Sequence, residues 1–149
     1  HDVGKVGIPD GILLKPGKLN AEEWDIMRTH ATLGGDALKQ ARESVKGKGA
    51  SFLKYAEEIA YYHHEKWDGS GYPLGLSGND IPISARLMAI ADVYDALLSK
   101  RCYKEAFSHE KALLIMEEGK GLHFDPVMLD VFLANEHLFF DIAEKYNDG

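Results

Sequence analysis

The stretch that decides the fold class is ISARLMAIADVYDALLS, residues 83–99. It is apolar on nearly every side when it is drawn as a helix, and a helix of that kind is buried in a larger structure. Elsewhere in the chain, apolar residues recur at three- and four-residue spacings, and no segment alternates convincingly as a strand does. The sequence therefore predicts an all-α domain, a bundle of helices.

Capping signals and breaker residues give the expected bounds of the helices. Asn20 and Glu23 are spaced as a capping box, and the glycines and prolines of residues 68–82 predict a loop. The prolines and glycines of residues 8–17 predict an extended segment without a regular element. The expected helices are residues 1–7, 20–43, 51–66, 83–99 and 109–118, with one or two more from Pro126 onward.

Length, charge and cysteine content limit the possible functions. The 149 residues suffice for one domain, and the net charge of −7 argues against binding to duplex nucleic acid. The single cysteine, Cys102, excludes an internal disulfide and fits a reducing cytoplasm. No apolar run has the length of a membrane span. Because the chain begins at His1 rather than at methionine, we expect it to be a piece of a longer protein.

Two aspartates stand out in the apolar stretch. Asp92 and Asp95 lie three residues apart on one side of the predicted helix. A buried carboxylate is costly unless it pairs with a cation or binds a metal. The simpler interpretation is a pair of salt bridges to Arg86 or Arg101, and the metal interpretation depends on other ligands being close.

Histidines supply those ligands. His30 lies within the apolar arc of its helix, beside Ile26 and Leu33, and His63 continues an apolar face that begins at Phe52. His30, taken alone, is more simply a hydrogen-bonded core histidine, and the second inward-facing histidine, His63, favours a ligand role. His64 lies about 100° further round the helix, so we expect the adjacent pair to bind two different metal ions. Both tryptophans, Trp24 and Trp67, are expected to pack in the core.

The first residues of the chain complete the set. His1 and Asp2 offer an adjacent imidazole and carboxylate, and Lys5 follows Asp2 by one turn. Nitrogen and oxygen ligands without thiolates suit iron, manganese or zinc in a hydrolytic site with more than one metal. The candidate ligands are His1, Asp2, His30, His63, His64 and Asp92.

Four segments carry a family resemblance. They are HDVGKVGIPDGILLKPGKL (1–19), HHEKWDGSGYPLGLSGNDIP (63–82), ARLMAIADVYDALLSKRCYKEA (85–106) and HFDP (123–126). In this order they resemble the HD-GYP family of the HD superfamily, over practically the whole chain. The resemblance implies an HD-domain bundle in a bacterial, cytoplasmic phosphodiesterase that hydrolyses cyclic di-GMP, or in some members cyclic GMP-AMP. It implies two or three divalent metal ions, iron in preference to manganese.

The resemblance also assigns roles by position. The six candidate ligands are the family's metal ligands, with Asp2 bridging, and Lys5 contacts the scissile phosphate. Tyr72 contacts substrate, and Asp95, Arg101 and Lys104 hold guanine or phosphate groups. Cys102 stands where the family usually has proline. Further family ligands precede the HD pair, so we expect residues 1–149 to be one HD-GYP domain that is incomplete at its N-terminus.

The resemblance brings partners and alternatives with it. The expected partners, besides the cyclic dinucleotide, are diguanylate cyclase (GGDEF) domains and an upstream receiver or sensor domain. A second hypothesis is a catalytically inactive cyclic-dinucleotide receptor or a docking module for diguanylate cyclases. A third, a phosphohydrolase of mononucleotides, is disfavoured because it does not explain the GYP loop.

Overall fold

The computed structural model describes residues 1–100 and 104–146, and within these two ranges it contains helices and no strand. The predicted all-α fold class is therefore confirmed. The elements are the 3-10 helices η1 (Val3–Gly7) and η2 (Gly78–Asp80) and the α-helices α1 (Asp10–Leu13), α2 (Ala21–Ser44), α3 (Lys48–Tyr62), α4 (Ile83–Leu98), α5 (His109–Glu118), α6 (Pro126–Ala134) and α7 (Glu136–Tyr146).

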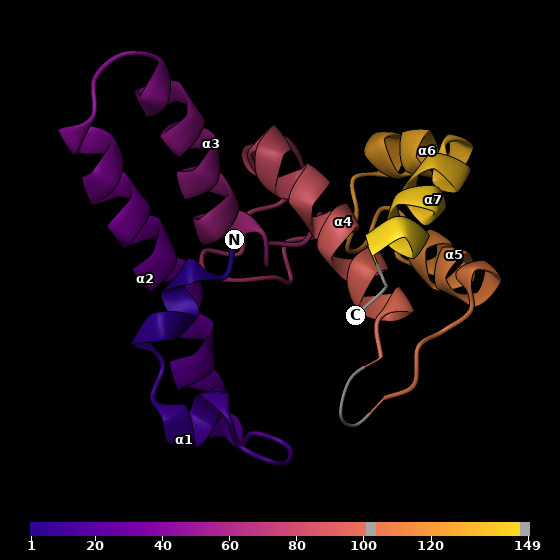
Figure 1. Cartoon of the computed structure of the whole chain (residues 1–149), viewed down its shortest axis with the longest axis horizontal. Coiled ribbons are helices and arrows are strands. Elements are labelled where there is room, and N and C mark those ends of the chain that lie inside the picture. Colours follow the sequence, from indigo (N-terminus) through magenta and orange to yellow (C-terminus); the bar gives the residue numbers. More distant parts are fainter. Residues whose placement is uncertain (101–103, 147–149) are drawn as a thin grey trace.

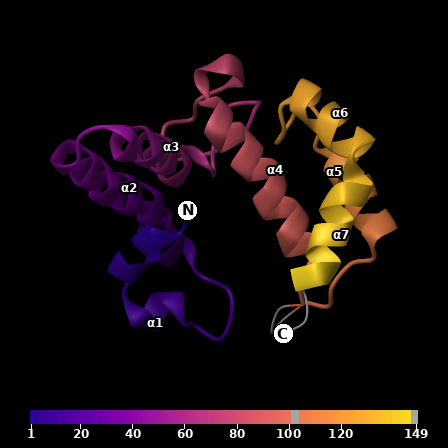
Figure 2. The same cartoon turned by 45° about the horizontal axis from the view of Figure 1, so that its top comes forward.

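Helix α4 lies between two groups of helices (Figure 1). It contacts α3 on one side and α5 and α6 on the other. Figure 2 shows the same order from a second direction, with α2 and α3 side by side and α5, α6 and α7 grouped beyond α4. A buried apolar cluster joins α4 to that second group, as the apolar character of residues 83–99 predicts. It contains Ile90, Tyr94, Leu97, Leu98, Ala112, Met116, Phe124, Leu129 and Phe132.

The start of α2 follows the expected capping box. The Asn20 side chain accepts a hydrogen bond of 2.8 Å from the backbone N–H of Glu23, and the Glu23 carboxylate accepts one of 2.8 Å from Asn20. The segment at 8–17 was expected to hold no regular element, and this is wrong in part. Residues 10–13 form the short helix α1, whose N-cap residue is Pro9 with a ψ of 135°.

Helix α3 has different bounds from those expected. It begins at Lys48, directly after Gly47, whose φ of 83° stops a helix from extending backward. It ends at Tyr62 rather than near Lys66. The His63 ring turns back onto the carbonyl oxygen of Ile59 at 2.8 Å. His63 is the C-cap residue of α3 and keeps helical dihedral angles, and its backbone N–H donates to the Ile59 carbonyl oxygen at 3.0 Å.

The apolar faces of α2 and α3 are less buried than expected. Trp24 is 47% exposed and Phe52 74% exposed, while the small residues Gly34 and Gly35 are buried. A Cβ atom at Gly35 would overlap the Tyr61 ring, so the neighbouring helix α3 approaches α2 along this small-residue face. The face that α3 and η1 cover is thus set by the glycines of α2, and larger apolar side chains beside it remain in contact with solvent.

The chain start is pressed onto α2 at a second glycine. Gly4 of η1 is buried, and a Cβ there would overlap the backbone carbonyl of His30 and lie 2.5 Å from the backbone nitrogen of Gly34. This close approach brings His1 and Asp2 against the part of α2 that carries His30. Among the described residues, no helix combines the length and the apolar composition needed to cross a bilayer.

Candidate metal centre

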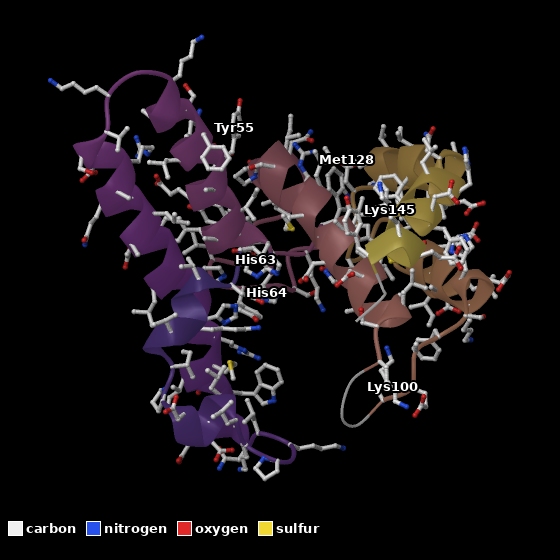
Figure 3. The ribbon with its side chains drawn as sticks, in the orientation of Figure 1. Tyr55, His63, His64, Lys100, Met128 and Lys145 are labelled. Carbon is white, nitrogen blue, oxygen red and sulfur yellow. The ribbon has the colours of Figure 1, made fainter. Side chains whose placement is uncertain are left out.

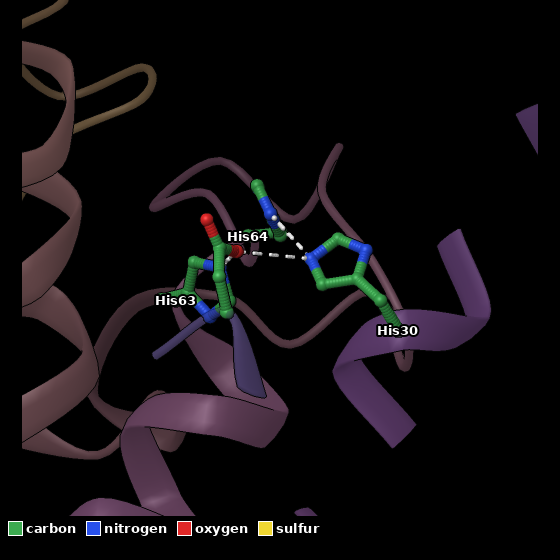
Figure 4. A group of neighbouring side chains, drawn as sticks. His30, His63 and His64 are labelled. Atoms are coloured by element: carbon green, nitrogen blue, oxygen red, sulfur yellow. Dashed lines mark hydrogen bonds and ion pairs between the residues drawn. The ribbon is translucent and has the colours of Figure 1, made fainter. Parts of the chain in front are cut away.

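Histidine and aspartate side chains from four segments converge where η1, α2, the end of α3 and α4 meet. One group comprises Asp2, His30, His63 and His64, and a second comprises His1, His63 and Asp92. In each group the potential ligand atoms lie within 4.8 Å of one another. Figure 3 shows His63 and His64 at the end of α3, and Figure 4 shows His30 directed toward both of them.

The two carboxylate oxygens of Asp2 face different neighbours. Oδ1 lies 3.5 Å from Nε2 of His30 and 3.6 Å from Nε2 of His63. Oδ2 lies 2.8 Å from Nζ of Lys5 and 3.4 Å from Nε2 of His1. Asp2 therefore offers Oδ1 to the first ligand group, while Oδ2 is paired with the Lys5 ammonium group.

His63 belongs to both ligand groups, and its ring is fixed in orientation. Its Nδ1 faces the carbonyl oxygen of Ile59, so in the neutral ring Nδ1 carries the proton and Nε2 presents a lone pair. That Nε2 is buried and has no hydrogen-bond partner among the residues that the structure describes. A buried, unpartnered lone pair facing carboxylates and other imidazoles fits a metal ion.

His30 and His64 meet at the same point. His30 Nδ1 faces the carbonyl oxygen of Met27 at 2.6 Å, which leaves its Nε2 as the ligand atom, 3.1 Å from Nε2 of His64. His64 belongs to the first group only, whereas His63 belongs to both groups, so the binding of different ions by the two histidines stays a prediction. The two rings lie 4.0 Å apart between centroids.

Asp92 reaches the site from α4. Its Oδ1 lies 3.3 Å from Nε2 of His1. The alternative partner Arg86 instead contacts Asp125 at 2.7 Å and the carbonyl oxygen of Ile81 at 2.9 Å. Asp92 is thus close to the second ligand group, and Arg86 is engaged elsewhere.

Burial and neighbouring charge favour the protonation states that metal ligands need. Partial burial opposes ionisation of Asp2, but the hydrogen bond and charge of Lys5, with smaller effects of His63 and His30, hold its pKa below the ordinary value. Burial lowers the pKa of His63, and burial together with the nearby His63 and His30 lowers the pKa of His64 to about 3. Near neutral pH Asp2 is therefore a carboxylate, and His63 and His64 are neutral imidazoles, the forms that bind metals.

The GYP loop closes one side of the centre. The Tyr72 ring stacks on His64 with 4.8 Å between centroids, and its backbone N–H donates to the His64 carbonyl oxygen at 3.2 Å. Burial raises the pKa of Tyr72 to about 12, so the phenol is neutral and can donate a hydrogen bond. The loop is held from below by Glu65, which is 1% exposed and accepts hydrogen bonds from the backbone of Leu74 and Leu76.

The other expected substrate residues lie apart from the ligand groups. Asp95 is exposed on α4, one turn beyond Asp92. Nζ of Lys104 lies 3.5 Å from the carbonyl oxygen of Ala96 and 4.3 Å from the centre of the Phe107 ring. Arg101 lies outside the described residues. Lys5 is within the centre, on Asp2.

Three residues beside the centre were missed in the sequence. Glu65 reads as an ordinary surface acid, and Trp24 was assigned to the core. Arg28 places its guanidinium 5.4 Å from the centre of the Tyr72 ring. The available signal was the i, i+4 spacing of Trp24 and Arg28, which puts both on one face of the helix that carries His30.

Comparison with known proteins agrees with the site. Residues 1–128 match the model of a family described as HD domain. The chain is 60% identical over 99% of its length to a probable cyclic di-GMP phosphodiesterase of Vibrio cholerae, covering 33% of that protein. It is 47% identical over 99% of its length to the 3′3′-cGAMP-specific phosphodiesterase 2 of Vibrio cholerae, covering 27% of it.

A third relative is the cyclic di-GMP phosphodiesterase response regulator RpfG of Xanthomonas campestris, 46% identical over 99% of this chain and 37% of the relative. The chain thus spans about a third of the length of these relatives. The matches cover the HD pair, the further histidines and the loop with Gly71, Tyr72 and Pro73. The chain therefore belongs to the HD domain family and, within it, to the HD-GYP family.

Proposed function

We propose that the chain is the catalytic domain of a metal-dependent phosphodiesterase that hydrolyses cyclic di-GMP or a related cyclic dinucleotide. The observation that carries the proposal is the convergence of imidazoles and carboxylates from four segments around the buried, unpartnered Nε2 of His63. The relatives described above are named as phosphodiesterases of cyclic dinucleotides, which supports the substrate class.

The ligand groups suggest how metals are held. Asp2, His30, His63 and His64 would hold one ion, and His1, His63 and Asp92 would contribute to a second. We expect two or three divalent ions, iron in preference to manganese by resemblance to the family, since nitrogen and oxygen ligands without thiolate suit either metal. Bound metals would supply Lewis acidity toward a phosphoryl oxygen and lower the pKa of water.

The remaining polar groups suit the handling of a phosphodiester. The ammonium group of Lys5, held on Asp2, adds positive charge where negative charge grows on phosphoryl oxygens during hydrolysis. The neutral phenol of Tyr72, above His64, can donate a hydrogen bond to a bound phosphate. Asp95, Arg101 and Lys104 remain proposed contacts to guanine or phosphate groups.

The test combines metal analysis with product analysis. Protein that includes the ligands expected before the HD pair is loaded with Fe²⁺ or Mn²⁺ without oxygen and its metal content is measured. It is then incubated with cyclic di-GMP or 3′3′-cGAMP, and the products are separated by chromatography. We expect at least two ions per chain and a linear dinucleotide product, with GMP formed afterwards if cleavage continues. Lys104→Ala should weaken substrate binding with metal content retained. If this metal-loaded protein, with the upstream ligands included, cleaves neither substrate, the proposal is overturned.

The same experiment separates the enzyme from the non-catalytic alternative. A cyclic-dinucleotide receptor or a docking module would bind nucleotide or a diguanylate cyclase (GGDEF) domain without turnover. All six candidate ligands are present in the chain, which favours the enzyme. If the linear dinucleotide forms only in the presence of metal, and its formation stops when a chelator is added, the hypothesis of a non-catalytic receptor is excluded.

Location and partners also belong to the proposal. We propose a bacterial cytoplasmic protein in which a receiver or sensor domain controls this domain, in keeping with the response regulator among its relatives. We propose that the GYP loop at Gly71–Pro73 also docks GGDEF domains. Pull-down with a purified GGDEF domain, with and without Tyr72→Ala, tests that contact, and equal capture by both forms would contradict it.

A further inference from the structure

A cavity of about 540 Å³ lies next to the candidate metal centre. Its walls come from the first turns of α2 and from the GYP loop. The lining includes Trp24, Asp25, Arg28, His64, Lys66 and Tyr72. Its size falls in the range of roughly 300–1,000 Å³ that is usual for small-molecule sites. His64 is a candidate metal ligand, and Tyr72 stacks on it. Because both residues also line the cavity, a ligand bound there would be next to the metals.

The α2 side of the cavity carries three groups that the metal centre does not use. The Trp24 indole is 47% exposed, which is unusual for so large an apolar group. The side chains of Arg28 and Asp25 are 54% and 79% exposed. Their nearest charged atoms are 4.0 Å apart, beyond hydrogen-bond distance, so both keep hydrogen-bonding groups for a ligand.

These three groups together match one base. Guanine presents two acceptors, O6 and N7, on one edge, which a guanidinium fits with two parallel hydrogen bonds. Its neighbouring edge presents N–H donors, which a carboxylate accepts. Its flat ring stacks on an exposed indole. Adenine has an amino group in place of O6 and would lose the paired contact to arginine.

We propose that this cavity is the subsite for one guanine base of the cyclic dinucleotide. Trp24 stacks on the base, Arg28 binds O6 and N7, and Asp25 accepts hydrogen bonds from the N–H groups at positions 1 and 2. The proposal rests on the function proposed above and deepens it, because it assigns the recognition of one substrate base to residues of α2. Arg28 is also kept in place by its contact with the Tyr72 ring.

A binding experiment that needs no catalysis tests the subsite. In a Trp67→Phe background Trp24 is the one tryptophan left in the sequence, and its fluorescence is followed while GMP or AMP is added to the chelator-treated chain. We expect quenching by GMP, with AMP about tenfold weaker. Arg28→Ala and Asp25→Asn should each weaken GMP binding about tenfold and reduce the preference over AMP. Lys39→Ala, an exposed cation on the same helix, is the control and should leave GMP binding unchanged.

A second measurement separates failure of the subsite from failure of the proposed function. The metal-loaded chain is assayed with cyclic di-GMP and with bis(p-nitrophenyl) phosphate, a phosphodiester without a base. Arg28→Ala should lower kcat/KM for cyclic di-GMP about tenfold more than for the simple diester. Equal losses, or equal binding of GMP and AMP by the parent chain, would overturn the subsite even where hydrolysis occurs. Selective GMP binding without any hydrolysis would support the subsite and overturn the proposed enzyme.

Discussion

The buried carboxylate of Glu65 accepts a hydrogen bond of 2.7 Å from the backbone N–H of Leu74. A second bond, of 3.0 Å, comes from the backbone of Leu76. Glu65 directly follows His63 and His64, so one side chain fixes the GYP loop to the segment that carries two candidate ligands. Both oxygens act as acceptors, which a carboxylate can do and an amide cannot.

Replacement of Glu65 with glutamine should therefore destabilise the protein. The amide nitrogen would face a backbone N–H, and one buried donor would lose its partner. We expect Glu65→Gln to lower the free energy of unfolding by about 2 kcal/mol. Urea denaturation followed by circular dichroism measures this change. Glu118→Gln, on the exposed end of α5, is the matched control, and similar values for the two variants would contradict the role of Glu65.

The close contact of Gly4 with α2 predicts that a larger residue at position 4 lowers both stability and metal affinity. Alanine at position 4 would collide with the His30 backbone and push His1 and Asp2 away from the other ligands. We expect Gly4→Ala to cost about 3 kcal/mol of stability and to reduce metal affinity. Gly11→Ala is the control, because a Cβ there meets nothing within 4 Å. Titration with Mn²⁺ compares the two, and equal affinities would show that the close approach does not position the HD pair.

His123 predicts a dependence of stability on pH. Burial, with a smaller effect of Lys66, lowers its pKa to about 4 from the ordinary 6.5. The unfolded chain therefore takes up a proton at this residue below about pH 6.5, whereas the folded chain does so only near pH 4. Stability should fall as the pH falls through that window, by up to about 3 kcal/mol from this group.

Urea unfolding of the metal-free chain at several pH values between 4 and 7 measures this contribution. His123→Gln should reduce the slope of stability against pH, because the side chain no longer titrates. His137→Gln, at an exposed position, should leave the slope unchanged. If His123→Gln and the parent chain lose stability in parallel, the prediction is wrong.

The inward placement of His30 and His63 could be predicted from the sequence, because both residues interrupt an apolar face. His30 and His63 are both 2% exposed, as their positions among apolar residues suggested. The end of α3 could not be predicted in the same way. Glu65 and Lys66 are good helix formers, so local preference continues the helix. In the structure the Glu65 carboxylate instead accepts a hydrogen bond from a loop residue nine positions later, a tertiary interaction that local preference does not contain.

The exposure of Trp24 was unpredictable for a related reason. A large aromatic residue is usually a core residue, and α2 has apolar residues on a broad arc. Which part of that arc is covered depends on where α3 and η1 come closest, and Gly34 and Gly35 determine this. Which α2 residues stay exposed to line the proposed base subsite is thus decided by helix packing. The apolar pattern of α2 alone does not predict that packing.

The two aspartates of α4 give the sharpest test of the metal centre. Asp92 lies 3.3 Å from His1 and belongs to the second ligand group, whereas Asp95 is exposed one turn further along. Asp92→Ala removes a carboxylate from between the candidate ligands and should abolish loading of the ion that His1 and His63 would share. Asp95→Ala removes the same charge from the same helix and should leave metal content intact while weakening substrate binding. Metal analysis after reconstitution distinguishes the variants, and circular dichroism shows whether both remain folded. Both variants lose one negative charge from α4, so a difference in their metal content would come from position and not from charge. Equal metal content in the two variants would remove Asp92 from the ligand set.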